Sequence, residues 1–294
     1  MIVIARSFGQ LGNRLSLYAH MIAAAREYGV QLANPCFAEY AHLFPATATD
    51  LWCRYPQSPI TTNPPSLRKR KILAKSIYLA ARSLSTVGLT SYPFHVLRIK
   101  GEHACDLSSD NFASLARSNR HLLALGWLFR SPQLRNRHAE AIRDHFQIAP
   151  QHRQCVDRLI AAIRAESDVI VGVHIRHGDY ANFMNGKYFY SVSQYADTMR
   201  NIAQQLTGQR VAFLVCSNIA MDHRDFGDLR VHFGSGHIIE DMYAMAEADL
   251  LVGPPSTYTG WASFYGNVPL VAMQTADQPI DISAIRPSPT SRVA

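Results

Sequence analysis

The second half of the chain alternates short apolar runs with segments of helical length. Residues 169–175 and 211–216 are predicted to be buried strands. Strands that alternate with helices in this way form a parallel sheet with right-handed crossovers. Shorter strands are expected at 229–232, 249–252 and 268–272, and helices at 151–165, 191–206, 238–247 and 257–265.

The first half begins with the same alternation of strand and helix. A strand at residues 2–4, a glycine turn at 9–13, a helix to about Tyr28 and a strand at 30–32 make one β–α unit. Five prolines and a basic run then indicate a long loop or an excursion of the chain over 45–71. Mostly helical segments are expected at 72–85 and 108–147, the latter interrupted near Gly126 and restarted at Ser131.

A change of character near Pro150 predicts two domains, 1–150 and 151–294, each of ordinary size for 294 residues. The economical architecture is α/β, with two such halves facing a cleft.

The formal charge of +7 favours anionic partners such as nucleotides, nucleic acid or a membrane surface. The basic residues are scattered apart from the run at 68–71, which is more typical of a solvated helix start than of a binding patch. Nucleic-acid binding is therefore the least favoured of the functions considered.

Five widely spaced cysteines without a CxxC pair suggest neither a zinc site nor a disulfide framework, and suit a reducing compartment. No run approaches the ~18 apolar residues of a membrane-spanning helix. The first six residues are strand-like rather than signal-like. We therefore expect a cytoplasmic protein without an integral membrane segment.

The strand at 169–175 ends in a cluster of polar groups: His174, Arg176, His177 and Asp179. Open α/β sheets bind ligands at the carboxyl edge, where these side chains would lie. Arginine offers a fork of donors suited to phosphate, and a nearby imidazole can bond a base or a sugar hydroxyl. The alternative is that polar residues merely cap a strand end.

Two further segments have both a binding and a structural interpretation. The glycines at 9–13 could let backbone approach an anion, or form an ordinary tight turn. Ser256 and Thr257, after the strand at 249–252, could bind phosphate or cap the next helix. Asp241 lies at the start of a predicted helix, where its charge could contact a ligand or stabilise the helix. The neighbouring Met242, Tyr243 and Met245 are more typical of a buried core than of a cofactor contact.

Three segments of the chain resemble the sequence motifs of a known enzyme family. His-Ile-Arg-His-Gly-Asp-Tyr at 174–180 resembles the HxRxGDY signature of bacterial α1,2-fucosyltransferases, within the superfamily of α1,2-, α1,6- and protein O-fucosyltransferases. Residues 9–13, followed by Arg14, are similar to their Gly-x-x-Gly-Asn-Gln loop, with arginine in place of glutamine. Residues 241–266 are similar to their last motif: an Asp-led helix, a buried strand, then Ser/Thr before an aromatic-rich helix.

The resemblance implies a GT-B fold of two Rossmann-type domains, the first on the acceptor side and the second on the donor side. It implies inverting, metal-independent transfer of fucose from GDP-fucose to a glycan hydroxyl, with no cofactor. Arg176 would contact the donor's β-phosphate and His174 the guanine or ribose. The remaining donor-binding residues would be Gly12, Asn13, Asn218, Asp241, Ser256 and Thr257.

The residues themselves agree with this chemistry. Arg176 and the helix-start amides at 256–257 could stabilise a departing nucleoside diphosphate, and no DxD motif for a metal occurs in the chain. Asp179 is the nearest carboxylate to act as base, and it could equally stabilise the turn. The chain departs from the family with Ser217-Asn218-Ile219 where relatives have a serine and an acidic pair, and with Gly260-Trp261 in place of two tryptophans. The alternative function is a non-catalytic nucleotide- or glycan-binding relative.

Overall fold

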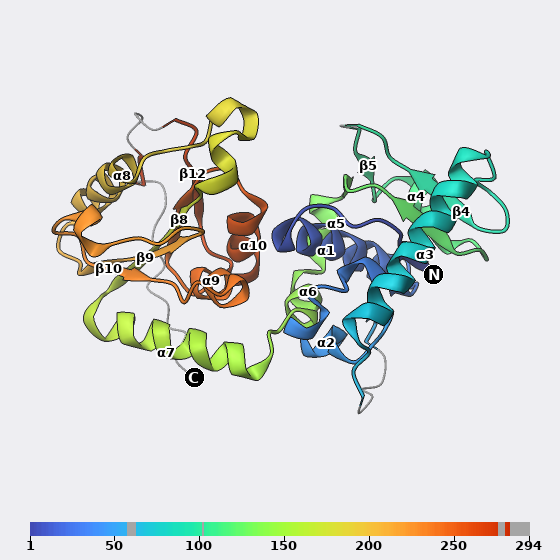
Figure 1. The fold of residues 1–294 in the computed structure, drawn as a ribbon, viewed down its shortest axis with the longest axis horizontal. Coiled ribbons are helices and arrows are strands. Elements are labelled where there is room, and N and C mark those ends of the chain that lie inside the picture. Colours follow the sequence, from blue (N-terminus) through green and yellow to red (C-terminus); the bar gives the residue numbers. More distant parts are fainter. Residues whose placement is uncertain (58–62, 102, 276–279, 283–294) are drawn as a thin grey trace. The chain divides into compact units, whose positions relative to one another are not determined.

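The chain folds into two compact units, Met1–Ala149 and Pro150–Ala294, which we describe one at a time in the computed structural model (Figure 1). The structure describes residues 1–57, 63–101, 103–275 and 280–282; the side chains of Asp179 and Phe183 are outside this description.

The second unit is built on a five-stranded sheet in which all strands are parallel. The strand order is β10-β9-β8-β11-β12, so β8 lies in the middle and the chain runs outward first on one side and then on the other. This is the doubly wound order of Rossmann-type folds, and its topological switch point lies between β8 and β11. The strands are β8 (Val169–Ile175), β9 (Val211–Ser217), β10 (Val231–Phe233), β11 (Leu250–Gly253) and β12 (Leu270–Ala272).

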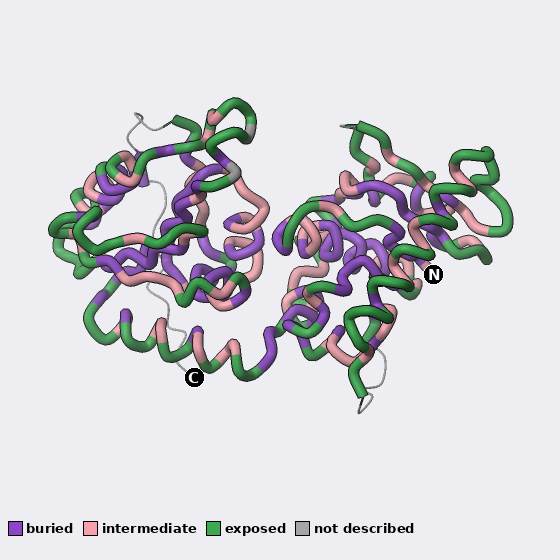
Figure 2. Tube along the Cα trace, viewed as in Figure 1, coloured by how far each residue is buried: buried purple, intermediate pink, exposed green. Residues whose placement is uncertain are grey.

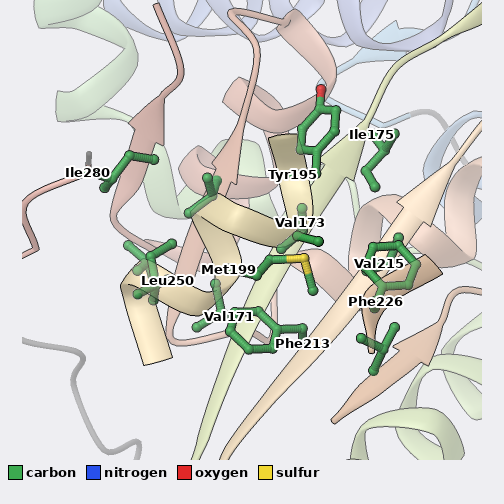
Figure 3. Packing of buried hydrophobic residues seen from close by; sticks show 14 of the residues in the cluster. Val171, Val173, Ile175, Tyr195, Met199, Phe213, Val215, Phe226, Leu250 and Ile280 are labelled. Atoms are coloured by element: carbon green, nitrogen blue, oxygen red, sulfur yellow. The ribbon is translucent and has the colours of Figure 1, made fainter. Parts of the chain in front are cut away.

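The two faces of this sheet are covered by different helices. Alternate residues of β8, among them Val171 and Val173, share a buried cluster with Tyr195 and Met199 of α8 (Val192–Gln205) (Figure 3). The intervening residues point to the other face, because successive strand residues alternate. On that face a Cβ added to Gly172 would lie 2.6 Å from Leu251, so the packing there tolerates no side chain.

The remaining helices of the unit complete its layers. α7 packs against α9, and α9 against α10. α7 buries only Val156 and Ile163, and Figure 2 shows the rest of it exposed or partly buried. The unit contains α7 (Pro150–Glu166), α9 (Ile238–Met245) and α10 (Thr257–Gly266), with short 3₁₀ turns η3 (Gly178–Ala181), η4 (Phe183–Gly186) and η5 (His223–Phe226).

The first unit has a five-stranded sheet of order β3-β2-β1-β6-β4, parallel except for β3, beside a two-stranded ladder of β5 and β7. The strands are β1 (Ile2–Ile4), β2 (Leu32–Ala33), β3 (Arg54–Tyr55), β4 (His95–Arg98), β5 (Cys105–Asp106), β6 (Leu122–Leu125) and β7 (Phe129–Arg130). The helices are α1 (Leu11–Glu27), η1 (Pro35–Phe37), η2 (Ala41–Leu43), α2 (Pro45–Ala48), α3 (Leu67–Thr86), α4 (Asp110–Arg117), α5 (Pro132–Arg137) and α6 (Ala139–His145).

Two expectations for this unit were wrong, and the structure decides between two alternatives for a third segment. Residues 122–125, expected within a helical segment, form β6, which pairs with both β1 and β4. The proline-rich segment 45–71 is an excursion rather than one long loop, because it contains α2, β3 and the start of α3. Arg70, expected on a solvated helix start, is buried.

Arg70 instead connects α3 to the preceding segment. Its guanidinium donates hydrogen bonds to the carbonyl oxygens of Asp50 at 2.7 Å and Ala48 at 2.6 Å. These bonds give hydrogen-bond partners both to the buried guanidinium and to the backbone carbonyls. Among the described residues, no helix is both long and apolar enough to span a bilayer.

Candidate functional site

The predicted site residues of the second unit gather at the carboxyl edge of its sheet. His174 is the sixth residue of β8, Arg176 follows that strand, and Ser256 and Thr257 follow β11. β8 and β11 are hydrogen-bonded neighbours, with Val173 opposite Val252. The residues therefore lie at the topological switch point, where open α/β sheets bind their ligands.

His174 is a buried, neutral imidazole. Its side chain is 5% exposed, and its ring stacks on that of Tyr258 with centroids 4.9 Å apart and planes 27° apart. Burial, and secondarily the charge of Arg176, lowers the pKa of His174 to about 3. Its Nδ1 atom has no hydrogen-bond partner in the described part of the chain. Buried polar atoms are rarely left unpaired, so this nitrogen is suited to bonding a ligand.

The strand end that carries His174 is closely packed against β11. A Cβ on Gly253 would lie 2.9 Å from the carbonyl oxygen of His174 and 3.1 Å from its Cβ. Any larger residue at 253 would push the two strand ends apart. Gly253 therefore fixes the distance between the His174 segment and the loop that leads to α10.

Arg176 is half-buried and lies in the loop after β8. Its guanidinium carbon is 5.3 Å from the ring centroid of Tyr180. The Tyr180 hydroxyl donates a hydrogen bond to the carbonyl oxygen of Pro255 at 3.2 Å. Tyr180 thus holds the arginine by a cation–π contact and joins the loops after β8 and β11.

Asn218, after β9, clamps the loop that carries Arg176. Its Oδ1 accepts a hydrogen bond from the His177 amide at 2.9 Å, and its Nδ2 donates to the His177 carbonyl at 3.4 Å. Gly178, with φ +58°, leaves room for this side chain, since a Cβ there would lie 2.8 Å from Nδ2. Asn218 positions the loop, and its contact with a donor stays a prediction.

Asp241 is a buried carboxylate in the first turn of α9, with 5% exposure. It accepts hydrogen bonds from the Gly236 amide at 3.2 Å and the Ser235 hydroxyl at 3.3 Å. Burial outweighs these bonds and raises its pKa from 3.8 to about 6. A Cβ on Gly234 would lie 2.4 Å from the carboxylate, so this glycine makes the space that the acid occupies. The perturbed pKa makes Asp241 a candidate for the functional site.

Ser256 performs the structural role considered for it, because its hydroxyl accepts a hydrogen bond from the Tyr258 amide at 3.1 Å and caps α10. Thr257 is the first residue of that ten-residue helix. A capped helix start remains attractive to an anion, since further amides and the helix dipole point toward it.

The other predicted site residues are placed as follows. Gly12 and Asn13 belong to the first unit and lie in the first turn of α1, which begins at Leu11. The turn before α1 is therefore shorter than expected. Gly9, with φ +56°, is required in this turn, because a Cβ there would lie 2.0 Å from Nδ2 of the Asn13 side chain. The side chain of Asp179 lies outside the described part of the structure.

One group in the described chain could hold a metal ion. His152, His237 and Glu240 bring ligand atoms within 4.8 Å of one another, and His152 Nδ1 is 2.8 Å from Glu240 Oε1. Two imidazoles and a carboxylate are ligands that zinc accepts. The imidazole rings of His152 and His237 stack with their centroids 4.5 Å apart, which is a less open arrangement than a tetrahedral metal site requires.

Sequence reasoning missed Tyr258, Tyr180 and Gly253. Tyr180 ends the motif at 174–180, so its place in the motif was a signal. Tyr258 follows the predicted phosphate loop directly, and an aromatic residue two positions after a helix cap was the available clue. Nothing in the sequence pairs Gly253 with His174, because that contact depends on β8 and β11 being neighbours.

No protein-family model matches the chain, and no protein of curated function matches it either. Solved structures do. An Arabidopsis thaliana FUT1 mutant in complex with GDP is 14% identical with a TM-score of 0.59, over 92% of this chain and 69% of that one. NodZ α1,6-fucosyltransferase co-crystallised with GDP is 17% identical with a TM-score of 0.53, over 92% and 94%. POFUT1 in complex with GDP-fucose is 12% identical with a TM-score of 0.53, over 92% and 97%. This likeness confirms the expected α/β, GT-B-like fold.

Proposed function

We propose that the chain is a glycosyltransferase that transfers fucose from GDP-fucose to a glycan hydroxyl. Transfer inverts the sugar and needs no metal, with the second unit on the donor side and the first on the acceptor side. The chain shares its fold with three fucosyltransferases whose structures hold GDP or GDP-fucose. That likeness supports the donor, and the residues at the switch point support the chemistry.

The observation that carries the proposal is the unpartnered Nδ1 of His174 beside Arg176 at the junction of β8 and β11. A neutral imidazole can give or accept a hydrogen bond to a ribose hydroxyl or a base. The neighbouring guanidinium supplies a fixed positive charge for a phosphate. Together they match a nucleoside diphosphate better than a neutral metabolite.

The reaction breaks the bond between the sugar carbon and the β-phosphate oxygen, while the acceptor oxygen forms the new bond. The electron pair leaves with GDP, and Arg176 and the α10 amides would stabilise the added charge. The acceptor hydroxyl loses its proton to a base, for which Asp179 is the candidate from the sequence. Gly12, Asn13, Asn218, Asp241, Ser256 and Thr257 would bind or shape the site around the donor.

The donor assignment is tested by thermal shift with GDP, ADP and UDP, each at a millimolar concentration. GDP should raise the unfolding temperature, since a ligand at 100 times its Kd stabilises the fold by ~2.7 kcal/mol. ADP and UDP should give smaller shifts. Equal shifts for the three nucleotides, or none for GDP, would contradict the donor.

Catalysis is tested by following GDP release from GDP-fucose, alone and with candidate glycans. Arg176→Ala should lower the rate by ~10²–10³ while the fold persists, as for loss of one donor to a developing charge. Arg210→Ala is the matched control, because Arg210 precedes β9 at the opposite sheet edge and pairs with Asp168 at 2.7 Å. GDP binding without any donor turnover would favour the non-catalytic binding relative.

A further inference from the structure

The first unit contains a basic cavity of about 410 Å³ at the carboxyl end of β1. The cavity is lined by residues just after β1, at the start of α1, in and after η1, and on one face of α3. Its volume falls in the range of small-molecule pockets, about 300–1,000 Å³, and exceeds the space of a bound ion or water. The cavity lies beside the segment 9–13 in sequence but is not lined by Gly12 or Asn13.

The charge of this cavity is unbalanced. Its lining contains four cations, Arg6, Arg14, Lys71 and Lys75, and one carboxylate, Glu39. Glu39 pairs with Arg14 at 2.8 Å and with Lys71 at 3.5 Å, so one negative charge is shared by two cations. Within the described ranges, no ion pair joins Arg6 or Lys75 to a carboxylate. An anion is therefore the ligand that this lining favours.

Arg6 is held in place without being neutralised. Its guanidinium carbon lies 4.3 Å from the ring centroid of Phe8 and 6.0 Å from that of Tyr78. Cation–π contacts fix the position of a guanidinium and leave its N–H donors available. Tyr78 also lines the cavity, where its ring offers an apolar surface beside the charges.

An apolar ring surface in a cavity lined by excess cations matches a ligand with both an apolar face and a negative group. A sugar ring carrying a carboxylate, phosphate or sulfate has both. An inorganic anion would not use the ring surface or fill the volume.

We propose that this cavity is the acceptor subsite and that it selects an acidic sugar residue. The inference rests on the proposed function, since only a glycosyltransferase has an acceptor. Arg6 and Lys75 bind the negative group, and Tyr78 packs against the sugar ring. The Arg14–Glu39–Lys71 group also lines the cavity and offers Glu39 as an acceptor for sugar hydroxyls.

The test is saturation-transfer NMR on the full chain with four matched monosaccharides: methyl galactoside, galacturonate, galactose 6-phosphate and galactose 6-sulfate. Signals from one or more charged sugars and none from the neutral sugar are expected, and the strongest identifies the acidic group. Equal signals from neutral and charged sugars, or none from any, would overturn the inference. Displacement of the bound sugar by an equal concentration of inorganic phosphate would reduce the cavity to an anion site and also overturn it.

Two variants connect the signal to the cavity. Arg6→Gln and Lys75→Gln should each weaken binding of the charged sugar roughly tenfold, which is the effect of losing one charge-assisted hydrogen bond. Lys69→Gln, an exposed lysine of the same helix that does not line the cavity, should leave binding unchanged. Wild-type binding in both cavity variants would contradict the assignment.

GDP thermal shifts on the same samples separate this inference from the proposed function. An unchanged GDP shift in Arg6→Gln and Lys75→Gln is expected. A GDP shift lost in these variants would assign the cavity to the donor and overturn the inference. A GDP shift in the wild type without acidic-sugar binding would refute the acceptor class alone, whereas sugar binding without any GDP shift would refute the donor.

Discussion

The imidazole of His174 stacks on the phenol ring of Tyr258, with ring centroids 4.9 Å apart. The Tyr258 hydroxyl donates a hydrogen bond to the carbonyl oxygen of Ile238 at 2.8 Å. Tyr258 therefore joins the first turn of α10 to the start of α9, and its ring packs against one face of the His174 imidazole. The orientation of the imidazole depends on this ring rather than on a hydrogen bond to Nδ1.

Replacing Tyr258 should separate these two contributions. Tyr258→Phe keeps the stacked ring and loses the bond to Ile238, so GDP affinity should change little. Tyr258→Leu removes the ring, and loss of an aromatic contact of about 0.5–1.5 kcal/mol should weaken GDP binding by up to about tenfold. Isothermal titration calorimetry with GDP measures both, and equal affinities for the two variants would show that stacking does not orient His174.

The raised pKa of Asp241 makes stability depend on pH. Burial moves this pKa from 3.8 to about 6, because the folded protein favours the neutral acid. The free energy of unfolding is therefore highest below pH 3.8 and falls as pH rises through 6. The loss is on the order of 3 kcal/mol, at ~1.4 kcal/mol for each pKa unit. Asp241→Asn removes the titrating group and should be more stable than the wild type at pH 7 by up to that amount.

Urea denaturation at pH 4, 5, 6 and 7 checks this expectation. The difference in unfolding free energy between Asp241→Asn and the wild type should grow from pH 4 to pH 6 and level off between pH 6 and pH 7. Glu240→Gln is the control, because at the neighbouring Glu240 burial is outweighed by hydrogen bonds to His152 and Ser235, and its pKa is lowered instead. A difference for Asp241→Asn that stays constant over the pH range would contradict a raised pKa.

Asn218 should act through the loop that carries Arg176. Asn218→Ala removes the acceptor for the His177 amide, at a cost to stability of about 1 kcal/mol, and should also weaken GDP binding because Arg176 loses its fixed position. Asn218→Asp keeps an oxygen for that amide and should retain most of the stability. The unfolding temperature and the GDP affinity of each variant are the measurements. Full GDP affinity in Asn218→Ala would exclude the positioning role.

The second unit was predictable because its strands are buried and bounded by turns. The strand expected at 169–175 is β8 in full, and the helix expected at 191–206 differs from α8 by one residue at each end. The first unit was less predictable. Residues 122–125 are four consecutive apolar residues, a pattern shared by a short buried strand and a helix segment, and only pairing with β1 and β4 decides between them.

The site shows the same division. His174 and Arg176 could be placed from the sequence because a polar cluster ended an apolar strand, which sets the sheet edge. The buried Arg70 could not, because a basic run indicates solvent exposure unless backbone carbonyls far away in sequence surround it. The contact between Gly253 and His174 likewise arises from strand order. Local patterns predicted which polar residues lie at the sheet edge, and tertiary packing determined what holds them there.

The ion pair of Arg164 and Asp249 offers a structural contrast to the site. Asp249 has a side chain 1% exposed, accepts from the Arg164 guanidinium at 2.8 Å and from the Ile170 amide at 2.7 Å, and so anchors the start of β8 at the sheet edge opposite the site. Arg164→Leu would leave a buried carboxylate without its cation and should destabilise the fold by about 3 kcal/mol. Arg164→Leu combined with Asp249→Asn should recover much of this loss, since the amide still accepts from Ile170 and carries no charge. Urea denaturation measures both variants, and a double variant less stable than Arg164→Leu alone would show that charge burial is not the cause.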